Sequence, residues 1–418
     1  MSSTILDKPQ RSRRRQLAGV CVGLLLLLLV GWTVRGAWSA PSEEHLRLQC
    51  REALEAARWM QLAGLAKELT ERHPSAGDGW VWRAQAARRA GNLQEAAEFL
   101  TRVPVDDPMA RTAESALFDV YFGPFNQPEA AARLARAILE HDPKSVLAWQ
   151  RLIFFEALSL QREAMIVDAR RAIELECESP EVYIYLFFAD APRFTNGVEL
   201  NRRWLEGDPT SEKFIVAHAI HLATTLEGGA PRDDIEAVRA IRQMADRKEA
   251  FLKDLLRRFP DNLEVLAWHL THAIDRGDVD AVESLLAELP SSADNDNRFW
   301  RWAGWAHAQR GRREKAEAAY ARALELHPLD WETRHFLAEL NRRRQNYAEV
   351  DRLQQLVERA HDLRRRLEKI PNVRSAEPGL LNDLADYGAG CGDHQFAEGL
   401  RRQMALITTP PTPGAHAP

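Results

Sequence analysis

The stretch NRFWRWAGWAHAQRGRREKAEAAYARALELHPLD, residues 297–330, decides the fold of this chain. Nearly all of it favours helix, and no part of it shows the alternation of a β-strand. Gly311 interrupts the helical pattern near the middle, where a glycine gives the backbone freedom to turn. Pro328 ends the pattern because proline cannot continue a helix. The stretch therefore predicts two helices joined by a tight turn.

The residue types in this stretch suit two helices that cross closely. Small residues allow the close approach, and large aromatic residues fill the gaps that the small ones leave. The unit resembles the tetratricopeptide repeat, with one mild departure at His307, where the family usually has an aromatic residue or leucine. The residues that carry the resemblance are Trp300, Ala303, Gly304, His307, Gly311, Ala316, Tyr320, Ala323 and Pro328.

Similar units follow one another along most of residues 43–404. They begin at Glu43, Gly77, Thr112, Val146, Leu263, Asn297, Trp331 and Pro378. Residues 180–260 also have helical patterns, but their prolines and glycines fall out of register. We therefore expect an all-α fold, an array of about eight to ten tetratricopeptide-like helix pairs over residues 43–407. The resemblance implies a right-handed superhelical solenoid whose first helices line a concave surface that binds peptides or proteins.

The resemblance also implies which side chains face a partner, since fixed positions of each unit usually line the groove. We expect the arginines among them to pair with carboxylates of a partner protein, and Trp305 to stack on it. The alternative is that exposed arginines only solvate a helix surface. The candidate partner-binding residues are Arg298, Arg301, Trp305, His335, Glu339, Arg342, Arg343, Arg88 and Arg89.

The N-terminal region has the pattern of a membrane anchor. Residues 17–34, LAGVCVGLLLLLLVGWTV, carry no charge and can just cross the hydrocarbon layer as a helix. Four arginines at positions 11, 13, 14 and 15 precede this run and only Arg35 directly follows it, so the positive-inside rule places residues 1–16 in the cytoplasm. Residues 35–42 would be a linker, and the array would lie outside the cytoplasm. The alternative is a secreted protein whose signal peptide is cleaved near Ala37–Ser39.

Composition narrows the class of partner. The formal net charge is −5, and the first 15 residues hold five cations against one aspartate, so the rest of the chain is more acidic still. An acidic array argues against nucleic acid, whose binding depends on neutralising phosphates. The abundance of arginine over lysine hints at a bacterial source and hence at the periplasmic face of an inner membrane. Residues 408–418 are rich in proline, which predicts a disordered tail.

Sequence motifs for catalysis, cofactors or metals are missing from the chain. His218 with His221 and His269 with His272 are each three apart on a predicted helix, but no third ligand stands nearby. Cys50, Cys177 and Cys391 have no metal-site or disulfide-framework spacing, and we expect isolated thiols rather than a bond between two of them. We therefore expect no enzyme activity, no cofactor and no metal site.

Two apolar sets each leave a choice between core and interface. One holds the aromatic residues Phe154, Phe155, Tyr183, Tyr185, Phe187 and Phe188, and we favour helix-helix core over an apolar groove for it. The other is a seam spaced three and four apart on a helix predicted to run to Ile370, and we favour packing on the array over dimerisation. Its residues are Leu353, Leu356, Ala360, Leu363, Leu367 and Ile370.

Together these features predict a membrane-anchored scaffold or adaptor that presents a repeat groove to a protein or peptide partner. A regulatory or accessory subunit of an envelope enzyme or assembly complex is the alternative. An enzyme with an unrecognised site around the histidine pairs is the third interpretation. The fold alone does not choose among them, because function resides in a site rather than in a fold.

Overall fold

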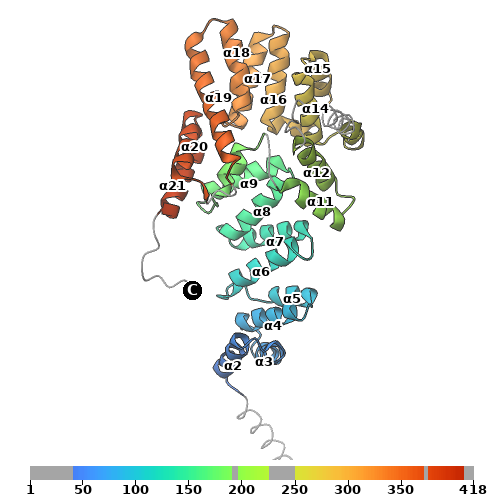
Figure 1. Cartoon of the computed structure of the whole chain (residues 1–418), viewed down its shortest axis with the longest axis vertical. Helices are drawn as coiled ribbons and strands as arrows, with labels where there is room; N and C mark the ends of the chain where they lie inside the picture. Colours follow the sequence, from blue (N-terminus) through green and yellow to red (C-terminus); the bar gives the residue numbers. More distant parts are fainter. Residues whose placement is uncertain (1–40, 191–195, 226–249, 371–374, 409–418) are drawn as a thin grey trace, which may run out of the picture. The chain divides into compact units, whose positions relative to one another are not determined.

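The computed structural model describes residues 41–190, 196–225, 250–370 and 375–408, and within these ranges all regular structure is helical (Figure 1). The chain divides into two compact units, residues 1–120 and 121–418. Among the described helices, none has the length and apolar character that a membrane crossing requires. The expected anchor at residues 17–34, the basic segment 1–16, most of the linker 35–42 and the tail from residue 409 lie outside the described ranges.

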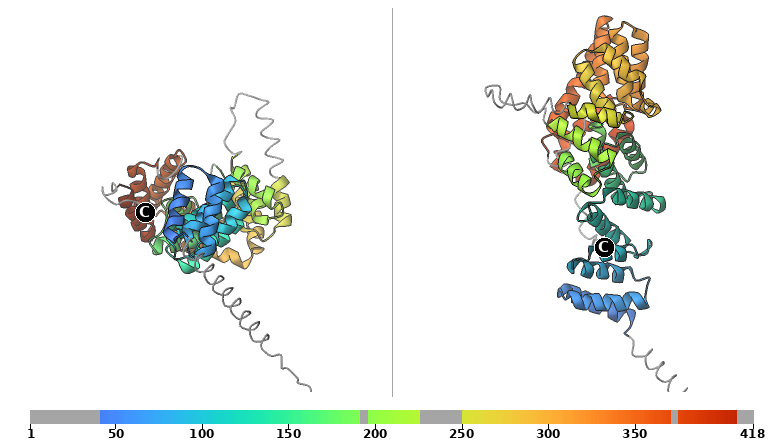
Figure 2. Two further views of the ribbon diagram at one scale, coloured as in Figure 1. Left: turned by 90° about the horizontal axis from the view of Figure 1, so that it is seen from below. Right: turned by 90° about the vertical axis from the view of Figure 1, so that its right-hand side faces the viewer.

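Paired helices follow one another in the first unit, as the repeats predict. The helices are α2 (Glu43–Glu55), α3 (Trp59–Arg72), α4 (Gly77–Arg89) and α5 (Leu93–Leu100), followed by α6 (Ala110–Phe122), which crosses the boundary between the units. The first two pairs form successive layers (Figure 2). Leu46 and Cys50 of α2, Leu62 and Leu69 of α3 and Trp82 of α4 share one core, so a single apolar cluster joins the two pairs.

The second unit continues the pairing through most of its length. Its helices are α7 (Pro128–His141), α8 (Val146–Leu158), α9 (Arg162–Glu174), α10 (Glu181–Phe187), α11 (Gly197–Gly207), α12 (Glu212–Thr225), α14 (Leu263–Asp275), α15 (Val279–Ala287), the 3-10 turn η1 (Ser291–Asn295), α16 (Asn297–Gln309), α17 (Arg313–Leu326), α18 (Trp331–Arg343), α19 (Tyr347–Leu367), α20 (Pro378–Gly390) and α21 (His394–Thr408). Residues 250–258 are helical as well.

The fifteenth residue of each predicted unit has a positive φ. These residues are Ala57 (51°), Gly91 (84°), Asn126 (52°), Leu160 (54°), Gly277 (68°), Gly311 (72°), Gln345 (61°) and Gly392 (82°). Each follows the first helix of its pair, where a left-handed residue ends one helix and turns the chain into the next. The units therefore keep one register even where glycine is replaced, which the glycines alone did not reveal.

The close crossing predicted for the unit at residues 297–330 is present. A Cβ placed on Gly304 of α16 would lie 2.5 Å from the ring of Tyr320 on α17, so only glycine fits there. Ala316 and Ala323 are fully buried on the same side of α17, and Tyr320 is 1% exposed. The small residues thus bring the two helices together, and the tyrosine fills the space between them.

Polar N-caps fix the start of three successive first helices in the second unit. Asn262 accepts hydrogen bonds from the first-turn amides of α14 at 3.1 and 3.2 Å. Asp296 accepts from the amide of Arg298 at 3.0 Å, and Asp330 accepts from the amide of Thr333 at 2.8 Å. A side-chain cap satisfies amides that a helix leaves unpaired, so each cap sets where its first turn begins.

The C-terminal pair α20–α21 folds back against the middle of the second unit. Phe396 of α21 packs edge-on against Tyr183 of α10, with ring centroids 5.2 Å apart. Tyr387 of α20 lies 5.7 Å from Phe187 in the same manner. Figure 1 shows α21 on the side of the unit where α9 lies. These contacts join segments about 200 residues apart, so the second unit closes on itself.

The aromatic set of the sequence belongs to this core rather than to a groove. Phe155 packs against Trp204 of α11 and Phe214 of α12, with centroids 5.8 and 6.3 Å apart. The rings of Tyr183 and Phe187 are buried under the C-terminal pair. These contacts support the preferred interpretation, in which the set stabilises helix packing.

The apolar seam of the long helix is also used inside the chain. α19 ends at Leu367 rather than at Ile370, three residues earlier than predicted. Leu353, Leu363 and Leu367 are each 4% exposed or less, so the seam packs on neighbouring helices of the same chain. A dimer along this seam would need those contacts to break.

Candidate functional site

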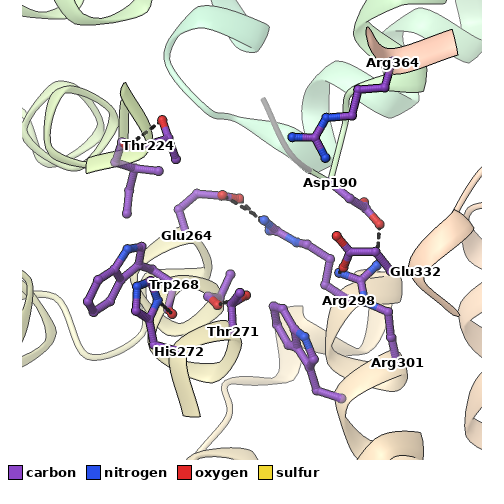
Figure 3. Close-up of a pocket in the computed structure, with 13 residues that line it drawn as sticks. Asp190, Thr224, Glu264, Trp268, Thr271, His272, Arg298, Arg301, Glu332 and Arg364 are labelled. Carbon is purple, nitrogen blue, oxygen red and sulfur yellow. Dashed lines mark hydrogen bonds and ion pairs between the residues drawn. The ribbon is translucent and has the colours of Figure 1, made fainter. Parts of the chain in front are cut away.

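A cavity of about 210 Å³ lies between the first helices of three consecutive repeats in the second unit (Figure 3). Helices α14, α16 and α18 supply most of its wall. The residues that line it are Asp190, Ile220, Thr224, Glu264, Ala267, Trp268, Thr271, His272, Arg298, Arg301, Trp302, Glu332 and Arg364. Charged side chains therefore form one part of the wall, and indole rings form another.

The repeat register positions the charged part of this wall. Glu264, Arg298 and Glu332 are each the second residue of their helix, on α14, α16 and α18 in turn. Equivalent residues of stacked repeats lie next to one another, so acidic, basic and acidic side chains adjoin across the three helices. Figure 3 shows Glu264 reaching the guanidinium of Arg298.

Arg298 is held by two carboxylates from its own chain. Its two terminal nitrogens donate to Glu264 at 2.9 and 2.6 Å, and Nη2 also lies 2.7 Å from Asp296. The residue is 3% exposed. Burial opposes the charge, but Asp296 and Glu264 outweigh it and hold the pKa of Arg298 well above its usual value. Arg298 is therefore a permanent cation inside the protein.

Arg301 is the centre of a second set of ion pairs. Nη1 lies 2.7 Å from Asp190 and 2.8 Å from Asp330, and Nη2 lies 2.9 Å from Glu332. The side chain is 2% exposed. Burial again opposes the charge, while Asp330, Glu332 and Asp190 together raise the pKa of Arg301. One guanidinium thus joins the segment after α10 to α16 and α18.

Arg162 of α9 links the two sets. It pairs with Asp190 at 2.5 Å and with Asp296 at 3.4 Å. Although burial alone would raise it, Arg162 and Arg301 hold the pKa of Asp190 well below its usual value. Nearby His327 is neutral, because burial lowers its pKa to about 4.

The charges of this network do not balance. Its three guanidiniums belong to Arg162, Arg298 and Arg301, and its five carboxylates belong to Asp190, Glu264, Asp296, Asp330 and Glu332. Arg364 lines the same cavity but forms its ion pair with Glu368 at 3.0 Å. The network therefore carries an excess of negative charge beside the cavity.

Glu332 is the carboxylate of this network most open to solvent. Its side chain is 33% exposed, against 10% for Asp190 and 12% for Glu264. Burial of its carboxyl raises the pKa of Glu332, and Asp330 and Asp190 add to that effect. Arg301 and Arg364 offset it only in part. A further cation near Glu332 would stabilise its charged form.

Three of the predicted partner-binding residues are placed differently from what the sequence suggested. Arg298 and Arg301 were expected to offer free guanidiniums to a partner, but carboxylates of this chain already surround both. Trp305 was expected to be open for stacking, but it is 7% exposed and packs with Leu270 and Val282 in the core. The helical positions are as expected, but the sequence did not show that acidic residues of neighbouring repeats would neutralise the arginines.

The other candidates lie on the surface. His335 and Glu339 of α18 face each other at 3.7 Å and are about half exposed. Arg342 and Arg343 are exposed at the end of the same helix. In the first unit Arg88 and Arg89 are exposed, and the guanidinium of Arg89 lies 4.9 Å from the ring centroid of Trp59. Contact of these residues with a partner stays a prediction.

Sequence reasoning missed Trp268, Asp190 and Glu264 as wall residues. Glu264 had a usable signal, since it occupies the same repeat position as Arg298. Asp190 had none, because it follows α10 in the stretch that is out of register and reaches the network only through folding.

The histidine pairs have structural surroundings. His218 and His221 lie 3.1 and 3.0 Å from the carbonyl oxygens of Val198 and Leu158. His269 lies 3.1 Å from the carbonyl of Leu252. Across the described ranges, no group of three or more His, Cys, Asp or Glu is arranged to hold a metal ion. The three cysteines of those ranges are free thiols.

Comparison with known protein families finds tetratricopeptide repeats in both compact units. Residues 48–109, which include most of α2 and all of α3 to α5, match one tetratricopeptide repeat family. Residues 297–340, which include α16, α17 and most of α18, match another. No curated protein matches the chain significantly. The repeats indicate a protein-interaction scaffold.

Several solved structures of helical proteins resemble the chain at low identity. The APC/C hetero-tetramer Cut9–Hcn1 is 14% identical, over 89% of this chain and 80% of that one, with a TM-score of 0.28. Yeast Tom70 is 14% identical, over 88% and 86%, with a TM-score of 0.27. A human IFIT1 dimer with PPP-AAAA is 14% identical, over 89% and 92%, with a TM-score of 0.28. Likeness at this level names neither a partner nor a ligand for this chain.

Proposed function

We propose that this protein is a membrane-anchored scaffold that binds a protein or peptide partner outside the cytoplasm. One observation carries the binding part of the proposal: the first helices of three consecutive repeats enclose a charged, aromatic cavity. The cavity, about 210 Å³ in volume, is open to solvent at Thr271, which is exposed, and at Glu332, which is 33% exposed, so a partner can enter it. The anchor rests on the uncharged run at residues 17–34 and the arginines before it.

Binding rather than catalysis fits the chemistry of the cavity. Its arginines are fixed as cations by their carboxylate partners, so they do not exchange protons near neutral pH. The excess negative charge of the network also disfavours nucleic acid, whose phosphates seek cations. We therefore infer a protein partner.

The proposal can be tested by capturing partners from membranes with the full-length protein in mild detergent after brief cross-linking. The test variant carries Arg342→Glu and Arg343→Glu, since both side chains are exposed on the predicted groove face of α18. The matched control carries Arg313→Glu and Arg365→Glu, exposed residues of the second helices α17 and α19. Mass spectrometry should find one partner with the wild type and the control but not with the test variant.

If the test variant and the control variant reduce capture equally, the partner does not bind specifically on the face formed by the first helices. The anchor needs a separate measurement. Protease added to the outer face of the membrane should digest the array and spare residues 1–16, and alkaline extraction should leave the full-length chain in the membrane. Release as a chain that starts near Ser39 would instead show cleavage and secretion.

A further inference from the structure

We propose that the cavity between α14, α16 and α18 receives one positively charged side chain, arginine or lysine, of the partner protein. The inference rests on the proposed function, because it assigns the site through which the scaffold would hold its partner. Charge, size and wall chemistry each contribute to it.

Charge complementarity gives the first reason. Five carboxylates share three guanidiniums in the network beside the cavity. A guest cation restores the balance, and its interaction with the carboxylates gains strength in a partly buried site. An acidic guest would add to the excess negative charge, and the arginines that could receive it already have carboxylate partners.

The volume gives the second reason. At about 210 Å³, the cavity is smaller than the ~300–1,000 Å³ typical of sites for drug-sized molecules. A cavity of about 150 Å³ accepts a benzene ring. The space therefore suits one long side chain rather than a whole cofactor or nucleotide.

The apolar part of the wall suits the stem of such a side chain. Trp268, Trp302 and Ala267 supply apolar surface for methylene groups. Arg301 already lies 5.4 Å from the ring centroid of Trp302, and the ring of His272 stacks on Trp268 with centroids 3.7 Å apart. We therefore assign these indole rings to the stem of the guest side chain and the carboxylates to its charged end. Arginine and lysine side chains have both an apolar stem and a positively charged end.

The test titrates the full-length protein in detergent with the peptide Ac-Gly-Arg-Gly-amide. Its lysine, glutamine and glutamate counterparts and free arginine are titrated in parallel. Tryptophan fluorescence and saturation-transfer NMR report binding. We expect the arginine or lysine peptide to bind at least tenfold more tightly than the glutamine peptide, and the glutamate peptide not to bind.

Three variants locate the site. Glu332→Gln removes the most exposed carboxylate of the network and should weaken the cationic peptide at least tenfold. Thr271→Trp, at an exposed position on the rim, should fill the cavity and abolish binding without touching an ion pair. Glu349→Gln is the control, because Glu349 is 30% exposed and bound to Arg352 but lies away from the cavity.

Binding that survives both Glu332→Gln and Thr271→Trp, or a preference for the glutamate peptide, would overturn the inference. Equal affinity for free arginine and for the peptide would overturn the assignment to a partner's side chain. If no cationic peptide binds while capture still depends on Arg342 and Arg343, the cavity inference fails and the scaffold stands. If the cationic peptide binds but capture does not depend on Arg342 and Arg343, the assignment of these two residues to the partner-binding groove is wrong instead.

Discussion

Arg170 on α9 and Asp393 at the start of α21 form a two-bond ion pair across 223 residues of chain. The two guanidinium nitrogens donate to the two carboxylate oxygens at 2.8 and 2.5 Å. Asp393 is 4% exposed, and it also caps α21 by accepting from the amide of Phe396 at 3.1 Å. This pair ties the last repeat to the middle of the second unit.

Removing this tie should loosen the C-terminal pair. In an Arg170→Met variant the buried carboxylate of Asp393 loses its cationic partner. Loss of one partner of a buried ion pair typically lowers stability by about 3–5 kcal/mol. We expect a smaller loss here because Arg170 is 21% exposed. Hydrogen exchange in peptides from α20 and α21 should therefore accelerate. Arg171→Met is the control, because the pair of Arg171 with Glu174 is more than half exposed and should matter little. Equal acceleration of hydrogen exchange in both variants would show that the Arg170–Asp393 ion pair does not hold α20 and α21 in place.

Arg301 and Arg342 should differ in what they do for the protein. Arg301→Met leaves three carboxylates without their shared cation and should lower stability by about 3–5 kcal/mol. Arg342→Met changes an exposed residue and should stay within about 0.5 kcal/mol of the wild type. Urea unfolding followed by circular dichroism measures both. A stable Arg301→Met variant would show that the internal network is dispensable.

The crossing of α16 and α17 should not tolerate a methyl group at residue 304. Gly304→Ala pushes a Cβ into the buried ring of Tyr320 and should destabilise by about 1–3 kcal/mol, the usual range for overpacking. Gly379→Ala is the matched change, since nothing lies within 4 Å of a Cβ on that helical glycine. That variant should be neutral or more stable by up to about 1 kcal/mol. Thermal unfolding of the two variants separates packing from helix propensity.

Gln345 occupies the turn position where other repeats carry glycine. Its φ of 61° strains a residue with a side chain, and the side chain is exposed. Gln345→Gly should therefore raise stability by about 0.5–1 kcal/mol, because the backbone entropy that glycine loses on folding offsets part of the relieved strain. Gly311→Ala, at the same position of the preceding repeat with a φ of 72°, should lower it. A destabilised Gln345→Gly variant would contradict the shared register of the two turns.

Glu156 on α8 should make stability depend on pH. The side chain is fully buried, and burial together with nearby Asp168 raises the pKa of Glu156 to about 9 although Arg136 opposes the shift. The unfolded chain releases this proton near pH 4.5 and the folded chain keeps it, so stability falls as pH rises from about 4.5 to about 9.

Glu156→Gln should remove that dependence, because glutamine keeps a neutral group in place. Its stability relative to the wild type should rise steadily between pH 5 and pH 8.5, by on the order of 1 kcal/mol for each pH unit. Urea midpoints at several pH values give the curve. Glu349→Gln should show no such gain, because hydrogen bonding to Arg352 lowers the pKa of Glu349. A flat difference curve for Glu156→Gln would mean that the native carboxyl is ionised.

Outside residues 180–260, the sequence by itself determined the helix pairs and their register. Residues 297–330 contain the small residues, the turn and the terminal proline of one unit, and each acts on neighbours within about 30 residues. Even the units without a turn glycine, such as the one that contains Gln345, were placed correctly by their apolar spacing. Local backbone preference and helical periodicity are readable along a chain because they act over a few residues.

Only the tertiary structure decided what the arginines do and where the site lies. Position 2 of a repeat looks like a groove residue in the sequence, but Arg298 becomes internal because Glu264 of the preceding repeat lies beside it. Asp190 and Asp393 meet their partners only after helices distant in sequence pack together. The charge and exposure of a side chain depend on its spatial neighbours, and those neighbours are set by packing between segments that no local pattern connects.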